Sequence, residues 1–101
     1  MLSKNDILSY LKELKPKLHN DGIEKVGLFG SFAKDSADLF SDIDLVIKTS
    51  EKFIKKYSSI KSFLYIEELR EDIQNKFKRD VDICDESGLK NKDILKDAIY
   101  V

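Results

Sequence analysis

Two aspartates follow a glycine-serine pair in this chain, at a spacing that would suit a phosphorylated substrate and its metal ions. Gly30 and Ser31 end an apolar run, and Asp42 lies 12 positions after Gly30. In a strand, Asp42 and Asp44 point to the same face, about 6.5–7 Å apart along the chain. Two like charges on one face repel unless a cation lies between them, and hard oxygen ligands favour Mg²⁺.

A third carboxylate is needed to complete such a site, and Asp82 is the best candidate. It lies between Val81 and Ile83 in another short apolar run, which an adjacent strand would bring beside Asp42 and Asp44. Two Mg²⁺ ions about 3.5–4 Å apart can activate an attacking oxygen and stabilise the leaving one. We therefore expect these three aspartates to be the catalytic and metal-binding residues, with Asp82 helping to deprotonate the acceptor hydroxyl.

The phosphate groups of the substrate are expected at the glycine-serine turn. Gly30 lets the backbone approach a phosphate without a Cβ in the way. The backbone N–H groups and the hydroxyl of Ser31 can bind phosphate oxygens. Lys34, one turn later, adds positive charge. Ser41, which precedes the first aspartate, completes the expected nucleotide-binding set.

Composition limits the class of protein. The chain has 101 residues, 42% of them hydrophobic, which fits a single domain over residues 1–101 that folds without disulfides. Cys84 is the only cysteine, and the net charge of −1 argues against a broad nucleic-acid-binding surface. The N-terminus lacks the apolar core of a signal peptide, and no apolar run approaches the ~20 residues of a membrane span. We expect a soluble, cytoplasmic protein.

The periodicity of apolar residues predicts alternating helices and strands. Helices are expected over 5–19, 32–38, 63–78 and 91–100, and strands over 26–29, 42–47 and 81–84. Pro16 predicts a kink or a restart in the first helix. The stretch around Ile54 and Tyr57 is a short helix or irregular. The expected fold is α/β (α+β), with a small mixed sheet and helices packed against it.

The combined motif resembles the minimal nucleotidyltransferase family of the polymerase β-like superfamily. The matching segments are Gly30-Ser31-Phe32-Ala33-Lys34, Ser41-Asp42-Ile43-Asp44-Leu45 and Val81-Asp82-Ile83. The resemblance implies the nucleotidyltransferase fold and Mg²⁺-dependent transfer of a nucleoside monophosphate to a hydroxyl, with release of pyrophosphate. It implies that Asp42 and Asp44 are metal ligands, that Asp82 is the third carboxylate, and that Gly30 and Ser31 hold the triphosphate.

Small members of this family resemble the antitoxin half of prokaryotic HEPN/MNT toxin–antitoxin pairs. The resemblance implies a helical HEPN ribonuclease toxin as the partner, with which the chain would form a hetero-oligomer. It also implies that the antitoxin silences the toxin by transferring AMP from ATP to a tyrosine hydroxyl.

Two alternatives stay open. The family usually has Arg-Gly where this chain has Lys34 and Asp35, and lysine cannot make the bidentate phosphate contact of arginine. This difference favours an antitoxin that neutralises its toxin by binding, with weak or no catalysis. Transfer to a small molecule such as an aminoglycoside is the third hypothesis, although such enzymes usually carry an extra substrate-binding domain.

Overall fold

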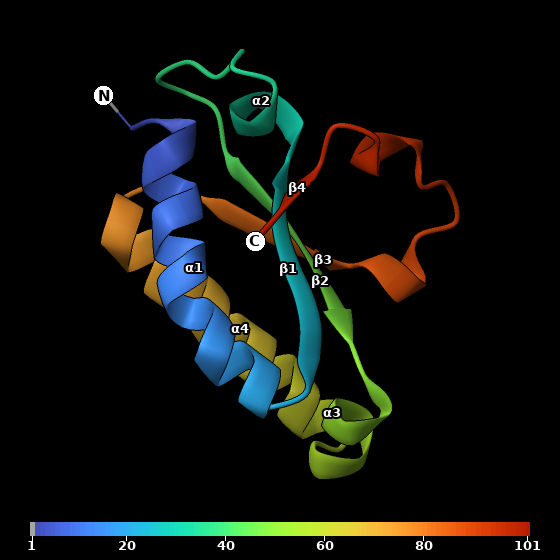
Figure 1. The fold of residues 1–101 in the computed structure, drawn as a ribbon. Coiled ribbons are helices and arrows are strands. Elements are labelled where there is room, and N and C mark those ends of the chain that lie inside the picture. The colour runs from blue at the N-terminus through green and yellow to red at the C-terminus, as the bar shows by residue number, and fades with distance from the viewer. Residues whose placement is uncertain (1) are drawn as a thin grey trace.

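The computed structural model describes residues 2–101 as a four-stranded sheet with helices on one face (Figure 1). The long helices are α1 (Lys4–Asn20) and α4 (Ser59–Phe77), and the short ones are α2 (Gly30–Ala33) and α3 (Glu51–Lys56). The strands are β1 (Ile23–Phe29), β2 (Ile43–Thr49), β3 (Val81–Asp85) and β4 (Ile99–Tyr100). Two 3₁₀ turns, η1 (Glu86–Gly88) and η2 (Asp93–Leu95), lie between β3 and β4.

The sheet is mixed, as the sequence predicted. Its strand order is β3-β2-β1-β4, with β1 antiparallel to both β2 and β4. The β2–β3 pair is parallel, because α4 carries the chain back between the two strands. In this register Asp44 lies directly opposite Asp82.

One face of the sheet forms the core. Ile43, Leu45 and Ile47 alternate along β2 and are at most 1% exposed, as expected for side chains that point away from the two aspartates. They belong to the same cluster as Leu11 of α1 and Ile73 of α4, the two helices that lie together across the sheet in Figure 1. The opposite face is therefore left for the carboxylates.

The predicted C-terminal helix over 91–100 is wrong. The structure has η2, a turn and the strand β4, whose Ile99 and Tyr100 pair with Leu28 and Gly27 of β1. Ile94, within this segment, is 50% exposed. Ten residues are too few for a stable helix by themselves, and an extended conformation satisfies the backbone groups along the open edge of β1.

Two further observations concern the other helices. The first helix continues through Pro16 to Asn20, which excludes the restart, one of the two outcomes expected at Pro16. The helix expected over 32–38 begins at Gly30 and ends at Ala33, because Asp35 has a φ of 59° and so cannot continue a right-handed helix. None of the helices within residues 2–101 combines the length and apolar character needed to cross a bilayer.

A partly buried hydrogen bond joins the end of α1 to α4. The hydroxyl of Tyr65 donates to Asp21 at 2.7 Å and, with help from Lys56, holds the pKa of this carboxyl below its usual value. We expect Tyr65→Phe to lower the free energy of unfolding by about 1–2 kcal/mol at pH 7. A lowered folded-state pKa stabilises the fold above the unfolded-state pKa, so the difference should shrink as the pH falls below about 4.

Chemical denaturation at pH 7 and pH 3.5 measures this difference. Tyr57→Phe is the matched control, because the Tyr57 ring packs against Phe53 and Tyr65 while no hydrogen bond of its hydroxyl is found within residues 2–101. A Tyr65→Phe variant as stable as the control at pH 7 would contradict the assigned role of the Asp21 bond.

Candidate nucleotide and metal site

The structure places two of the three predicted carboxylates opposite each other and the third just before β2. Asp44 and Asp82 are direct partners across the parallel β2–β3 pair, where neighbouring strands lie about 4.8 Å apart. Asp42 precedes β2 by one residue and is exposed. The backbone N–H of Ile43 donates to the carbonyl of Asp80 at 2.9 Å, which ties the two strands together where they begin.

The electrostatics of this group fit a divalent cation. Partial burial, followed by the negative charges of Asp82 and Asp42, raises the pKa of Asp44. Among residues 2–101, no three acidic, histidine or cysteine side chains lie close enough together to hold a metal ion as they stand. An open set of carboxylates suits Mg²⁺, which usually keeps several waters and takes phosphate oxygens as its other ligands.

Gly30 lies directly against the Asp44 carboxylate. Its φ is +73°, and a Cβ built at this position would collide with Oδ2 of Asp44. Both its backbone conformation and its neighbour therefore require glycine. Because Asp44 also pairs with Phe29 at the end of β1, the glycine-serine turn and the carboxylates form one continuous surface.

The other predicted nucleotide-binding residues differ in their surroundings. Ser31 is half-buried at the start of α2, and its carbonyl accepts a 2.9 Å hydrogen bond from the Ser36 N–H. Lys34 is exposed at the end of α2. The hydroxyl of Ser41 accepts from the Asp38 N–H at 2.9 Å and so takes part in the turn that precedes Asp42. Their nucleotide contacts stay predictions.

The Lys34–Asp35 departure from the family pattern has a structural explanation. Asp35 adopts φ of 59°, the left-handed conformation that glycine favours and aspartate tolerates. Its carboxylate accepts a 2.9 Å bond from Nζ of Lys4 in α1, which offsets its negative charge. The aspartate is thus accommodated by a partner 31 positions earlier in the chain.

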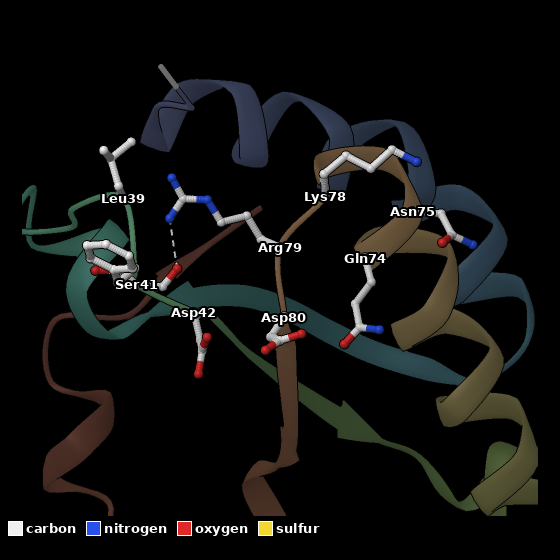
Figure 2. Close-up of a pocket in the computed structure, with 9 residues that line it drawn as sticks. Leu39, Ser41, Asp42, Gln74, Asn75, Lys78, Arg79 and Asp80 are labelled. Carbon is white, nitrogen blue, oxygen red and sulfur yellow. Dashed lines mark hydrogen bonds between the residues drawn. The ribbon is translucent and has the colours of Figure 1, made fainter.

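The sequence did not assign to the site two residues that lie just before β3, Arg79 and Asp80. Asp80 lines a cavity of about 430 Å³ together with Asp42, and Figure 2 shows both side chains directed to the same side of the strands. Arg79 bonds the loop that carries Ser41. The alternation that paired Asp42 with Asp44 also places Asp80 on the face of Asp82, so this signal was present in the sequence.

Cys84 shares the face of Asp82 two residues further along β3. Burial raises the pKa of its thiol, and Asp82 and Asp85 raise it further. A thiol kept protonated is a poor nucleophile, so we assign no chemical step to Cys84.

Comparison with known proteins identifies the family. The family described as "Polymerase beta, Nucleotidyltransferase" matches residues 12–100, so this chain belongs to the polymerase β-type nucleotidyltransferases. "Protein adenylyltransferase MntA" of Thermococcus cleftensis is 30% identical over 105 residues, which cover 100% of this chain and 98% of the relative. A chain from a "crystal structure of the toxin-antitoxin with AMP-PNP" has a TM-score of 0.63 at 18% identity, over 98% of this chain and 72% of that one. The latter likeness concerns the fold.

The raised pKa of Asp44 leads to a prediction about the metal-free protein. A carboxyl with a raised folded-state pKa lowers stability above the unfolded-state pKa, and this cost disappears as the pH falls below about 4. We expect Asp44→Asn to raise the melting temperature in EDTA at pH 7 by about 1–3 °C, the shift that a few tenths of a kcal/mol causes in a domain of this size. Thermal unfolding at pH 7 and pH 3.5 measures the effect.

The exposed Glu13 of α1 offers a control for the loss of one negative charge, as Glu13→Gln. In excess Mg²⁺ the advantage of Asp44→Asn should shrink or reverse, because only the wild type gains stability from the ion. A lower melting temperature of Asp44→Asn in EDTA would contradict the electrostatic description.

Proposed function

We propose that this protein transfers AMP from ATP to a hydroxyl of a HEPN-type ribonuclease toxin, a tyrosine being the expected acceptor, and thereby acts as its antitoxin in the prokaryotic cytoplasm. The observation that carries the proposal is the direct opposition of Asp44 and Asp82 beside Gly30. The similarity to a protein named a protein adenylyltransferase supports a protein rather than a small molecule as the acceptor.

The proposed site residues divide into a phosphate-binding group and a metal-binding group. The backbone N–H groups at Gly30 and Ser31 would hold the phosphates of ATP, because glycine allows the close approach. Asp42, Asp44 and Asp82 would hold two Mg²⁺ ions. When bound, these ions supply positive charge to the attacking and leaving oxygens.

The reaction is a substitution at phosphorus. The acceptor oxygen forms a bond to the α-phosphorus of ATP, and the bond from that phosphorus to the oxygen bridging the α- and β-phosphates breaks. Pyrophosphate leaves with the bonding electrons, and AMP remains on the acceptor oxygen. Asp82, exposed at the site, is positioned to take the hydroxyl proton directly or through a water molecule.

A second candidate function is neutralisation of the toxin by contact alone. Large apolar side chains are exposed on α3 and on the first turns of α4. They are Ile54 (65%), Ile60 (73%), Phe63 (62%) and Leu64 (57%). Clusters of this kind often mark protein–protein interaction sites. On this account the carboxylates would be dispensable for inhibition.

Inhibition of the ribonuclease separates the two functions. The toxin to be tested is the product of the neighbouring gene. It is incubated with ATP, Mg²⁺ and either the wild type or the Asp42→Asn, Asp44→Asn double variant, and the ribonuclease activity of the toxin is then measured. Our proposal expects that only the wild type inhibits, and that inhibition persists after the two proteins are separated. Equal inhibition by the double variant, lost on separation, would favour contact alone.

A further inference from the structure

Arg79 donates hydrogen bonds to the loop before β2 and makes a cation–π contact with α2. Its Nη1 donates to the carbonyl oxygens of Asp38 and Ser41, each at 2.8 Å. Its Cζ lies 5.3 Å from the centre of the Phe32 ring. Figure 2 shows the side chain reaching from the start of β3 toward the loop, with the bond to Ser41 dashed.

These contacts connect the three segments that make the candidate site. Phe32 belongs to α2, which begins at Gly30. Ser41 immediately precedes Asp42. Arg79 itself lies two residues before β3, the strand of Asp82. The side chain of Arg79, which comes from the segment before β3, therefore touches both α2 and the loop that leads to Asp42.

Apart from its end at Ile43, whose N–H donates to the carbonyl of Asp80, the loop makes few contacts that would fix it. Leu39 is 71% exposed and Phe40 is 92% exposed, so this part of the loop buries little apolar surface. Its internal bonds, such as the 2.8 Å bond from the Phe40 N–H to Asp38, shape the turn without fixing it to the sheet. On the N-terminal side of Asp42 the loop is therefore held by the guanidinium of Arg79, whereas on the C-terminal side Ile43 is fixed by its bond to Asp80.

The backbone segment that carries Arg79 is itself held in place. Gln74 of α4 accepts a 3.1 Å bond from the Val81 N–H through Oε1. The same oxygen accepts from Nη1 of Arg70 at 2.7 Å. The segment between α4 and β3 is consequently anchored on the helix, which fixes the backbone position from which the Arg79 side chain extends.

We propose that Arg79 is a positioning residue that sets the distance of Asp42 from Asp44 and Asp82. The inference rests on the proposed function, in which Asp42 is a metal ligand. A guanidinium is required because its planar array of donors can bond two carbonyl oxygens while its charge stays close to the Phe32 ring. Lysine, with a compact ammonium group, can replace only part of this arrangement.

Metal binding tests the inference without any acceptor protein. Mn²⁺ replaces Mg²⁺ as the probe, and free Mn²⁺ is measured by electron paramagnetic resonance in titrations of the wild type, Arg79→Lys and Arg79→Gln. We expect Arg79→Gln to weaken Mn²⁺ binding by about 10–100-fold, the usual effect of losing a residue that orients metal ligands. The Mn²⁺ affinity of Arg79→Lys should lie between those of the wild type and Arg79→Gln. Hydrogen exchange should become faster at the amides of residues 39–42 in both variants.

Lys78→Gln is the matched control, because it removes a neighbouring positive charge from the cavity that Arg79 and Asp42 also line. Its Mn²⁺ affinity should stay within about threefold of the wild type, since it leaves the Arg79 bonds in place. If Arg79→Gln fails to fold, Arg79→Lys alone decides the matter.

Wild-type Mn²⁺ affinity and unchanged loop exchange in a folded Arg79 variant would overturn the inference. If the Arg79 variants bind Mn²⁺ more weakly but the wild-type protein transfers no AMP, Arg79 is still the positioning residue and the proposed function is rejected. The two failures are therefore distinguishable.

Discussion

Replacing Asp44 by asparagine is expected to reduce AMP transfer by about 10²–10³-fold or more. Asparagine keeps the shape of the side chain but removes the negative charge that would hold the metal ion against the substrate phosphates. We expect Asp44 to be the most sensitive of the three carboxylates, because it pairs with Asp82 across the sheet and touches Gly30. Initial rates of transfer at saturating ATP and Mg²⁺ measure the effect.

The Asp44→Asn variant should remain folded, since removal of this charge is expected to stabilise the metal-free protein. Loss of transfer then reflects the site and not the fold. Asp72→Asn, on the exposed side of α4, is the control and should transfer AMP at the wild-type rate. Transfer by Asp44→Asn within about threefold of that rate would exclude Asp44 as a metal ligand.

Replacing Gly30 by alanine is expected to reduce AMP transfer by at least about 10²-fold. The new Cβ would collide with the Asp44 carboxylate, and alanine at a φ of +73° is strained. A displacement of a reacting group by about 1 Å can by itself cost about 10²-fold in rate. The same initial-rate assay measures the loss, and the melting temperature shows whether the fold survives.

Gly88→Ala is the matched control, because a Cβ at that position would meet no atom within 4 Å. It should leave both the rate and the melting temperature close to the wild type. Full activity in Gly30→Ala would mean that the turn does not approach the carboxylate as closely as the structure shows.

The sequence predicted the mixed fold and the strands that carry Asp44 and Asp82, while the roles of these residues stay predictions. The alternation of Asp42-Ile43-Asp44 required one face for the core and one for chemistry, and the burial of Ile43 confirms that division. Asp82 was predicted to lie beside Asp44 from its apolar flanks alone, and the parallel register of β2 and β3 bears this out.

What the sequence did not predict depends on contacts between distant residues. The segment 91–100 has helical spacing, but pairing of Ile99 with Leu28 on the edge of β1 decides its conformation. The pairing of Asp35 with Lys4 joins residues 31 positions apart. No local pattern encodes such pairs, because each depends on how the elements pack.

The Arg79 contacts are missed for the same reason. An arginine between a helix and a strand is ordinarily a solvated residue, and its bond to the Ser41 carbonyl spans 38 positions. Only the parallel pairing of β2 with β3 brings the two segments together.

The position of the radioactive label on the partner tests the central claim most directly. The purified protein, Mg²⁺ and the product of the neighbouring gene are incubated with ATP labelled at either the α- or the γ-phosphate. Our account predicts that the partner acquires the α-label, that the γ-label is released as pyrophosphate, and that the Asp42→Asn, Asp44→Asn double variant transfers neither. Label from the γ-phosphate on the partner, or α-label transferred equally well by the double variant, would contradict it.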